Sequence, residues 1–406
     1  MNDRIQSKPA REANPARRRF SDRTVAFATQ GSTAWAVSDR AAALAAAGAD
    51  VISLTVGDVD VDTPADVVAA AHRSLDLGRT HFAPVAGDRE LRAAIATRAN
   101  VRNGTRYGAD NVVVFPGAQC ALYSTLQCLA GPGDEVVLLE PVYATYEAVI
   151  GASGARAVTV SLRDRGALNF SIERIENALS ARTRVLVLNT PNNPSGFVVD
   201  AADIGRLARL CALHGIWLVS DEVYAELAYD RPHRSPASCP EISDQLVLVD
   251  SLSKSHAMTG WRLGWAIGPV DLAVHLEALA QAELFGSPPF VQDAARVALA
   301  STQQIPATLR ALYRERRDVL LDGLIASPAL RPIVPHGGMF VLVDVSATGL
   351  DGQAFAEHLL EEAGVAVVPG GAFGASVRDC VRLGLTQPAP RLREACARIA
   401  GWVNRR

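Results

Sequence analysis

Two short apolar runs in the middle of the chain each end in a cluster of polar residues. RVLVLN (184–189) is followed by TPNNPSG (190–196), and IWLVS (216–220) leads into SDEVYAEL (220–227). Runs of this length, rich in β-branched residues, are typical of buried parallel strands. Because open α/β sheets bind ligands beyond the carboxyl ends of their strands, the pattern predicts an α/β fold with a polar site at that edge.

A third polar segment, SLSKSHAMTGWRLG (251–264), carries chemistry that suits one small molecule. The amine of Lys254 can condense with an aldehyde once its pKa is lowered by its surroundings. Ser251, Ser253 and Arg262 can bind a phosphate dianion. Pyridoxal phosphate (PLP) carries both groups, so the segment indicates a PLP site. Taken alone, the segment also fits a polar loop with one solvated lysine.

The two polar clusters upstream supply other contacts that PLP requires. Asp221 is placed to pair with the pyridine nitrogen, and a protonated ring nitrogen makes the cofactor an electron sink. Asn193 and Tyr224 can donate hydrogen bonds to the phenolate oxygen of the ring, which stabilises its deprotonated form. The sequence therefore predicts that three separate segments meet around one cofactor.

Asn193, Asp221, Tyr224, Lys254 and Arg262, in this order and spacing, resemble the class I/II aminotransferases of PLP fold type I. The resemblance covers nearly the whole chain. It implies an enzyme that transfers the α-amino group of an amino acid to a 2-keto acid by a ping-pong mechanism. Lys254 is then the catalytic residue, because its amine moves a proton as general base and afterwards as general acid.

The resemblance assigns roles to further residues that hold the cofactor. In VVVFPGAQCALY (112–123), the backbone N–H groups of Ala118 and Gln119 point at the phosphate from the positive end of a helix. Without the resemblance, this stretch is an ordinary strand-to-helix connection. In EPVYATY (140–146), Tyr143 occupies the place of an aromatic ring that stacks on the pyridine face.

Arg382 gives the most specific indication of which chemical group the substrate carries. It lies in CVRLGL (380–385) between apolar neighbours, and a buried arginine needs an anion. The resemblance identifies this anion as the α-carboxylate of the amino acid, held bidentately by the guanidinium. Gly57, through its backbone N–H, and Asn193 are the other substrate-binding residues that the resemblance implies.

The chain departs from the family pattern in two places. Phe82 stands where the family has a cofactor-binding tyrosine, whose hydroxyl reaches the phosphate in the neighbouring subunit of a homodimer. Phosphate binding is then weaker by about 1.5 to 3 kcal/mol if nothing replaces that hydrogen bond. His81 beside it either compensates or is a packed or solvated histidine. Val59 and Val61 replace the usual Pro and Phe of the entrance loop.

Composition agrees with a two-domain cytoplasmic enzyme. The chain has 406 residues, too many for one core. Its net charge of -3 gives no electrostatic reason to expect nucleic acid or an anionic membrane as a partner. No apolar run approaches the ~20 residues of a membrane span. The six cysteines show no metal-ligand spacing, which indicates free thiols in a reducing cytosol and no metal site.

The predicted elements divide the chain into four parts. Residues 1–20 contain six Lys or Arg and form either a disordered basic tail or a basic docking arm. Residues 21–62, with a helix at 35–47, and residues 301–406 make a small α+β domain. Residues 63–300 make the large PLP-binding domain, whose seven-stranded, mostly parallel sheet is flanked by helices. Its strands are expected at 112–115, 135–139, 156–160, 184–189, 216–220, 246–250 and 263–268.

Four stretches look most like the arginine-pyruvate transaminases of bacterial arginine catabolism. These stretches are SLSKSHAMTGWRLGW, PGAQCALY, EPVYATYEAV and GSPPFVQDAA. The implied donor is L-arginine or another basic amino acid, and the implied acceptor is pyruvate. A guanidinium substrate needs a carboxylate near the pocket mouth. Asp58, Asp60 and Glu283 are candidates, although each also fits a solvated surface charge.

Three other functions stay open. One is a broad-range aminotransferase for neutral or aromatic amino acids. Another is a PLP-dependent carbon-sulfur β-lyase, which shares the fold and the lysine but expels a β substituent after deprotonation of Cα. The third is a PLP-binding transcription regulator. This last function needs a DNA-binding domain before the aminotransferase part, which a short irregular tail does not supply.

Overall fold

The computed structural model describes residues 20, 32–164, 166–300 and 304–406. Nearly all of the predicted basic tail at residues 1–20 therefore lies outside the described residues, and so does the beginning of the segment that follows it. Within the described part of the chain, no helix is long and apolar enough to cross a membrane.

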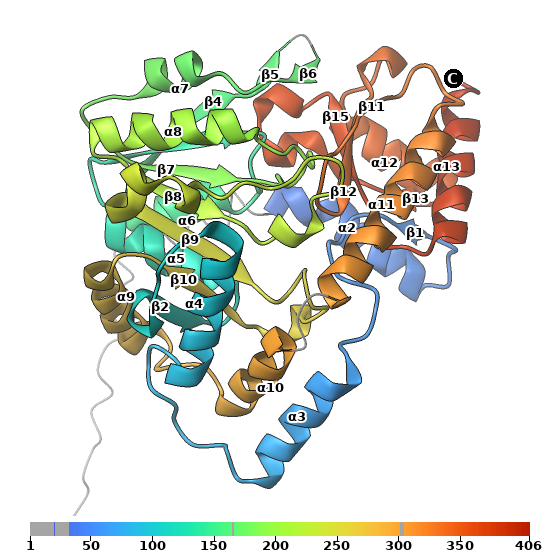
Figure 1. Cartoon of the computed structure of the whole chain (residues 1–406). Coiled ribbons are helices and arrows are strands. Elements are labelled where there is room, and N and C mark those ends of the chain that lie inside the picture. The colour runs from blue at the N-terminus through green and yellow to red at the C-terminus, as the bar shows by residue number, and fades with distance from the viewer. Residues whose placement is uncertain (1–19, 21–31, 165, 301–303) are drawn as a thin grey trace, which may run out of the picture.

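A seven-stranded sheet forms the centre of the larger part of the molecule (Figure 1). In order across the sheet, its strands are β2 (Val112–Phe115), β10 (Gly264–Ile267), β9 (Leu246–Ser251), β8 (Trp217–Asp221), β7 (Thr183–Asn189), β3 (Glu135–Glu140) and β4 (Arg156–Ser161). In this sheet, β10 runs antiparallel to both of its neighbours and the remaining strands are parallel to one another. Each strand lies within one residue of its predicted limits, and the predicted α/β fold is confirmed.

Helices cover both faces of this sheet because alternate residues of each strand point to opposite sides. In β3, Val136 and Leu138 pack into one apolar core, whereas Val137 and Leu139 pack into the other. The helices that contribute to the first core are α5 (Ala118–Leu129), α6 (Tyr146–Ser153) and α9 (Val270–Glu283). Those that contribute to the second core are α3 (Ala65–Asp76), α4 (Arg89–Asn103), α7 (Ile172–Ala178), α8 (Ala201–His214) and α10 (Pro289–Ala300).

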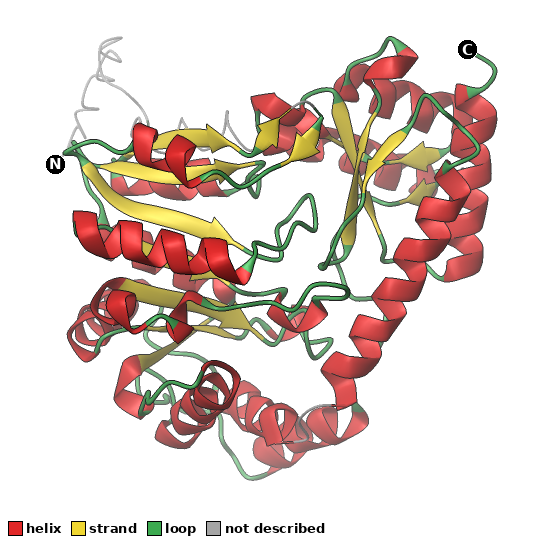
Figure 2. Cartoon of the chain, turned by 45° about the horizontal axis from the view of Figure 1, so that its top comes forward, coloured by secondary structure: helices red, strands yellow, loops and turns green. Residues whose placement is uncertain are grey.

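A smaller part of the molecule, beside the large sheet in Figures 1 and 2, contains a four-stranded sheet. In order, its strands are β11 (Arg331–Ile333), β12 (Phe340–Asp344), β15 (Cys380–Gly384) and β14 (Val368–Pro369). Its helices are α2 (Ser32–Ala46), α11 (Gln304–Leu324), α12 (Gly352–Ala363) and α13 (Ala389–Val403). A helix was predicted at 35–47, and α2 confirms it.

Strand β1 (Ile52–Ser53) pairs in parallel with β13 (Val365–Ala366). This pairing ties the N-terminal segment to the C-terminal part of the chain, an arrangement that the predicted small domain requires. The limits of the two domains stay a prediction.

Charged contacts hold the two parts of the molecule together. Arg163, in a short hairpin of β5 (Arg163–Asp164) and β6 (Ala167–Leu168), donates from Nη1 to the backbone oxygen of Ser376 at 2.8 Å. Oε1 of Glu140, at the end of β3, accepts a hydrogen bond from the backbone nitrogen of Ser376 at 2.5 Å. The carboxyl edge of the large sheet is therefore fixed against the smaller sheet.

Candidate active site

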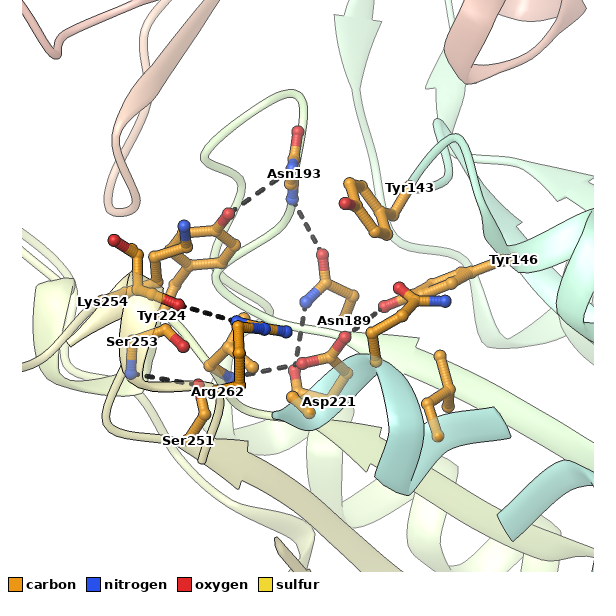
Figure 3. Close-up of a pocket in the computed structure, with 15 residues that line it drawn as sticks. Tyr143, Tyr146, Asn189, Asn193, Asp221, Tyr224, Ser251, Ser253, Lys254 and Arg262 are labelled. Carbon is orange, nitrogen blue, oxygen red and sulfur yellow. Dashed lines mark hydrogen bonds between the residues drawn. The ribbon is translucent and has the colours of Figure 1, made fainter. Parts of the chain in front are cut away.

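Strands β7, β8 and β9 end together at the edge of the large sheet that faces the smaller part. Their register places Asn189 opposite Asp221, and Asp221 opposite Val249. A cavity of about 200 Å³ lies at this edge (Figure 3). Ten of the residues predicted from the sequence line it: Ala118, Gln119, Tyr143, Asn193, Asp221, Tyr224, Ser251, Ser253, Lys254 and Arg262.

A second cavity of about 380 Å³ adjoins the first and shares several lining residues with it. Gly57 and Arg382, the other predicted substrate residues, line this second cavity. Phe82 lines neither cavity. Its side chain is 85% exposed and packs edge to face against the ring of Phe285. A single chain thus assembles every predicted site residue except Phe82, whose predicted role lies in a neighbouring subunit.

Lys254 lies where the two cavities meet. Its Nζ donates a hydrogen bond to the backbone oxygen of Gly57 at 2.5 Å. Removal from water is the main reason why the pKa of this amine falls to about 8. The charge of Asp58 opposes the shift, and the charges of Arg262 and Arg382 add to it. An amine with this pKa can attack an aldehyde and exchange protons near neutral pH.

Asp221 presents a buried carboxylate to the first cavity. Its Oδ2 accepts a hydrogen bond from Oη of Tyr146 at 2.6 Å, and its Oδ1 accepts one from the backbone nitrogen of Val223 at 3.3 Å. Burial raises the pKa of Asp221 to about 6, and the hydrogen bond from Tyr146 opposes this rise. A buried carboxylate is stabilised by a cationic partner, and the protonated pyridine nitrogen of PLP is such a partner.

Two glycines shape another side of the same cavity. Gly117 has a φ of +88°, and a Cβ at this position would lie 2.4 Å from Nη2 of Arg262. A Cβ on Gly264 would lie 2.4 Å from the backbone nitrogen that begins α5. Because both side chains are missing, the guanidinium lies against the N-terminus of α5, and Ser251 and Ser253 add hydroxyl groups to the lining. This set of donors fits a phosphate dianion.

Two asparagines connect Asp221 to the other end of the site, as the dashed lines in Figure 3 show. Asn189 donates from Nδ2 to the backbone oxygen of Asp221 at 3.1 Å and accepts at Oδ1 from the backbone nitrogen of Asn193 at 2.8 Å. Asn193 in turn donates to Oη of Tyr224 at 3.4 Å. Burial raises the pKa of Tyr224, so its hydroxyl keeps the proton and can donate to a phenolate. The ring nitrogen, phosphate, phenolate and aldehyde of PLP each have a matching group here.

Arg382 on β15 is buried, with only 1% of its surface exposed. Its Nη1 donates to Oδ1 of Asn193 at 3.0 Å and its Nη2 donates to the backbone oxygen of Thr55. The guanidinium carbon lies 4.1 Å from the ring centroid of Phe340 and 4.9 Å from that of Phe373. Nε has no hydrogen-bond partner in the described part of the chain, and burial lowers the pKa of Arg382 to about 10. A buried guanidinium with neutral partners is a binding site for a carboxylate.

A separate group of charges lies behind Asp221. Oε2 of Glu222 accepts a hydrogen bond from Nη2 of Arg102 at 2.5 Å, and Nη1 of Arg102 reaches Oδ2 of Asp250 at 3.3 Å. Ser235 also donates to Glu222, at 2.5 Å. Burial acts to raise the pKa of Glu222, but the charge of Arg102 and the contacts with His233 and Ser235 together outweigh it, and the pKa falls to about 2. The charge of Arg102 therefore offsets that of Glu222 next to the site.

The sequence patterns missed two residues of the site, Tyr146 and Asn189. Asn189 ends a predicted strand, so its place beside the ligand edge could have been inferred from the same rule that identified Asp221. Tyr146 acts through a contact with Asp221, which is 75 residues away along the chain. Such a contact leaves no local signal in the sequence.

Residues 49–399 match the family described as aminotransferase class I and II. The chain belongs to the class I and II aminotransferases, which depend on PLP, so the family and cofactor predicted from the sequence are confirmed.

Individual relatives agree with this membership. The chain is 50% identical over 382 residues to arginine-pyruvate transaminase AruH of Pseudomonas aeruginosa. The aligned region covers 94% of this chain and 97% of that protein. It is 37% identical over 382 residues to aspartate/prephenate aminotransferase of Thermus thermophilus, over 93% of this chain and 97% of the relative. Among solved structures, aspartate aminotransferase from Thermus thermophilus with maleate has a TM-score of 0.90 and 36% identity, over 95% and 100% of the two chains. The predicted enzyme class and fold type are confirmed.

The lowered pKa of Lys254 predicts how the apoprotein captures PLP. Below pH 8 the amine is mostly protonated and does not attack an aldehyde, so the capture rate should rise as pH increases through about 8. Rapid mixing, quenching with borohydride and mass spectrometry of the lysine peptides measure this rate. Lys8, the other lysine of the chain, is the internal reference. A midpoint near the ordinary lysine value of 10.5 would contradict the assignment.

Tyr146→Phe removes the hydrogen bond that Oη of Tyr146 donates to Asp221. A hydrogen bond of this kind stabilises an ionised carboxylate by about 1.5 to 3 kcal/mol. The pKa of Asp221 then rises, its pairing with the ring nitrogen weakens, and the Kd for PLP should increase about tenfold. Fluorescence titration of the apoprotein measures the Kd. Tyr123→Phe, which changes a tyrosine of α5 outside the cavity lining, is the control. An equal Kd for both variants would rule out this role for Tyr146.

Proposed function

We propose that this chain transfers the α-amino group of L-arginine, or of another basic amino acid, to pyruvate. The observation that carries the proposal is the presence of Lys254 and Arg382 in the lining of one cavity. An amino acid whose α-carboxylate lies on Arg382 is then in the same cavity as an amine with a pKa of about 8. The 50% identity to AruH, whose name states arginine and pyruvate, supports these two substrates.

In this proposal, PLP is held by side chains and backbone groups that surround the first cavity. Asp221 pairs with the ring nitrogen, Tyr143 covers one face of the ring, and Asn193 and Tyr224 donate to the phenolate oxygen. The phosphate is held by the guanidinium of Arg262 together with backbone N–H and hydroxyl groups. The residues that supply these last groups are Ala118, Gln119, Ser251 and Ser253.

The reaction depends on proton transfer by Lys254. When bound, PLP supplies an aldehyde that takes up the amino group and a ring that accepts the electron pair left at Cα. Arg382, Asn193 and the backbone N–H of Gly57 hold the α-carboxylate and so orient Cα. Nζ of Lys254 would remove the proton from Cα as general base and deliver it, as general acid, to the carbon of the cofactor's aldehyde group. The same transfers in reverse aminate pyruvate, which gives ping-pong kinetics.

We further propose a cytoplasmic homodimer, with residues 63–300 as its large domain and residues 21–62 and 301–406 as its small domain. The pairing of β1 with β13 supports this division. The six unpaired cysteines support a reducing compartment, and recovery in a periplasmic fraction would contradict it. The exposed aromatic pair of Phe82 and Phe285 supports an interface between subunits.

Single-turnover absorbance of the PLP-loaded protein tests the proposed reaction. The protein is mixed separately with arginine, alanine, phenylalanine, aspartate and cystathionine. Arginine should convert the absorbance of the cofactor's aldehyde form rapidly to that of its amine form, and pyruvate should reverse the change. Lys254→Ala should abolish turnover because no other lysine lies among the described residues.

Each other outcome of this experiment has a definite meaning. Conversion by alanine or phenylalanine alone would keep the aminotransferase and exclude arginine as the donor. Release of pyruvate from cystathionine without the amine form would establish a β-lyase instead. Appreciable turnover by the Lys254→Ala protein would contradict the proton-transfer role.

The proposed interface predicts the effect of Phe82→Arg. Burial of an unpaired guanidinium at a subunit contact is unfavourable, so this variant should shift toward monomer in sedimentation velocity. Leu213→Arg is the control, because Leu213 is 79% exposed on α8 and is not part of the aromatic pair. A stable dimer of the Phe82→Arg protein would place the interface elsewhere.

A further inference from the structure

The second cavity contains a carboxylate that the proposed reaction does not use. Among the described residues that line it, Asp58, Lys254 and Arg382 carry formal charges. Lys254 and Arg382 act on Cα and the α-carboxylate, so Asp58 is left to face the rest of the amino acid. We infer, on the basis of the proposed aminotransferase function, that Asp58 selects amino acids whose side chains end in a cation.

Asp58 is exposed at the cavity lining and is oriented by a neighbour. Its Oδ1 accepts a hydrogen bond from Oγ1 of Thr259 at 2.5 Å. Thr259 lines both cavities, so this contact fixes the carboxylate between them. The preceding residue, Gly57, accepts the hydrogen bond from Lys254, which places Asp58 one residue from the reacting amine. The negative charge of Asp58 also acts on this amine, because it raises the pKa of Lys254.

The other two carboxylates that the sequence offered are engaged elsewhere. Both oxygens of Asp60 are held by Arg316, at 2.6 Å from Nη1 and 2.7 Å from Nη2, and Arg316 is only 5% exposed. This bidentate pair neutralises Asp60. Glu283 ends α9 and accepts a hydrogen bond from Oγ of Ser124 at 2.7 Å. Neither Asp60 nor Glu283 lines the two cavities of the site. Of these three carboxylates, Asp58 is therefore the one that lines a cavity of the site.

The walls beside Asp58 suit the aliphatic stem of a long side chain. Val56, Trp35 and Phe340 line the same cavity. Val56 is 49% exposed, and covering it with methylene groups of a substrate removes apolar surface from water. The indole of Trp35 also favours a nearby cation. A substrate with a terminal carboxylate would instead meet the like charge of Asp58, which is unfavourable. Arginine and lysine have the required stem and charge, whereas aspartate has neither.

The substitution that tests this inference is Asp58→Asn, which keeps the shape and removes the charge. Its matched control is Asp62→Asn, because Asp62 is an exposed acid of the same loop that does not line the cavity. Asp58→Asn should lower kcat/KM for arginine about 5- to 20-fold more than that for alanine, because any effect on the amine of Lys254 applies to both substrates. The control should leave both values unchanged.

Equilibrium binding gives a second readout that does not require turnover. δ-Guanidinovalerate has the carboxylate and the guanidinium of arginine but no α-amine, and valerate is its counterpart without the guanidinium. The PLP-loaded protein should bind δ-guanidinovalerate more tightly than valerate, and this preference should shrink in Asp58→Asn and at high salt. Titration calorimetry measures both affinities.

The outcomes separate this inference from the proposed function. If the wild-type protein converts arginine but Asp58→Asn keeps the full preference for δ-guanidinovalerate, the role of Asp58 is refuted and the transaminase remains. Loss of that preference in Glu283→Gln alone would assign selection to Glu283. If arginine is not converted at all, the proposed donor fails, whereas a preference that depends on Asp58 still supports the cation-selecting carboxylate.

Discussion

The register of β7, β8 and β9 determines where the polar groups of the site lie. These strands are buried on both faces, and their apolar residues alternate between two cores. A slip of one residue would exchange the faces and bury the polar ends of the strands in the wrong core. Because the cores fix the register, Asn189 lies opposite Asp221 and both meet the cavity. Apolar packing far from the ligand thus positions the groups that bind it.

Local patterns in the sequence predicted the large sheet and the polar residues at its strand ends, since strand ends and the loops that follow them are encoded by adjacent residues. The family resemblance added the remaining predicted residues of the site. Contacts between distant segments were not predictable in this way. The hydrogen bond from Tyr146 to Asp221 is one such contact. The pairing of Asp60 with Arg316 spans 256 residues. Because of this pairing, three carboxylates that looked equivalent in the sequence have different roles in the fold. The position of Phe82 is a further case, because the role predicted for it requires a second chain.

Arg102, which is half-buried, and Arg382, which is fully buried, have different kinds of partner. Arg102 lies between Glu222 and Asp250, so its charge is balanced within the chain. Arg382 contacts an amide, a backbone oxygen and aromatic rings, none of which carries a negative charge. The unfavourable free energy of burying its guanidinium is therefore not offset by these partners, and a carboxylate that enters the cavity can offset it. The charge of the first arginine is offset within the fold, and that of the second is free to pair with an anion.

The cluster of Arg102, Glu222 and Asp250 also limits how this protein can evolve. Loss of Arg102 removes the cation that both carboxylates share, and breaking a buried pair in this way typically costs about 3 to 5 kcal/mol, a large share of the stability of a domain. Loss of Arg102 alone is therefore disfavoured, although a joint replacement of the cluster by apolar residues of similar volume is tolerable. Across homologous chains a change of Arg102 should therefore be accompanied by changes of Glu222 and Asp250, and this coupling keeps the environment behind Asp221 constant.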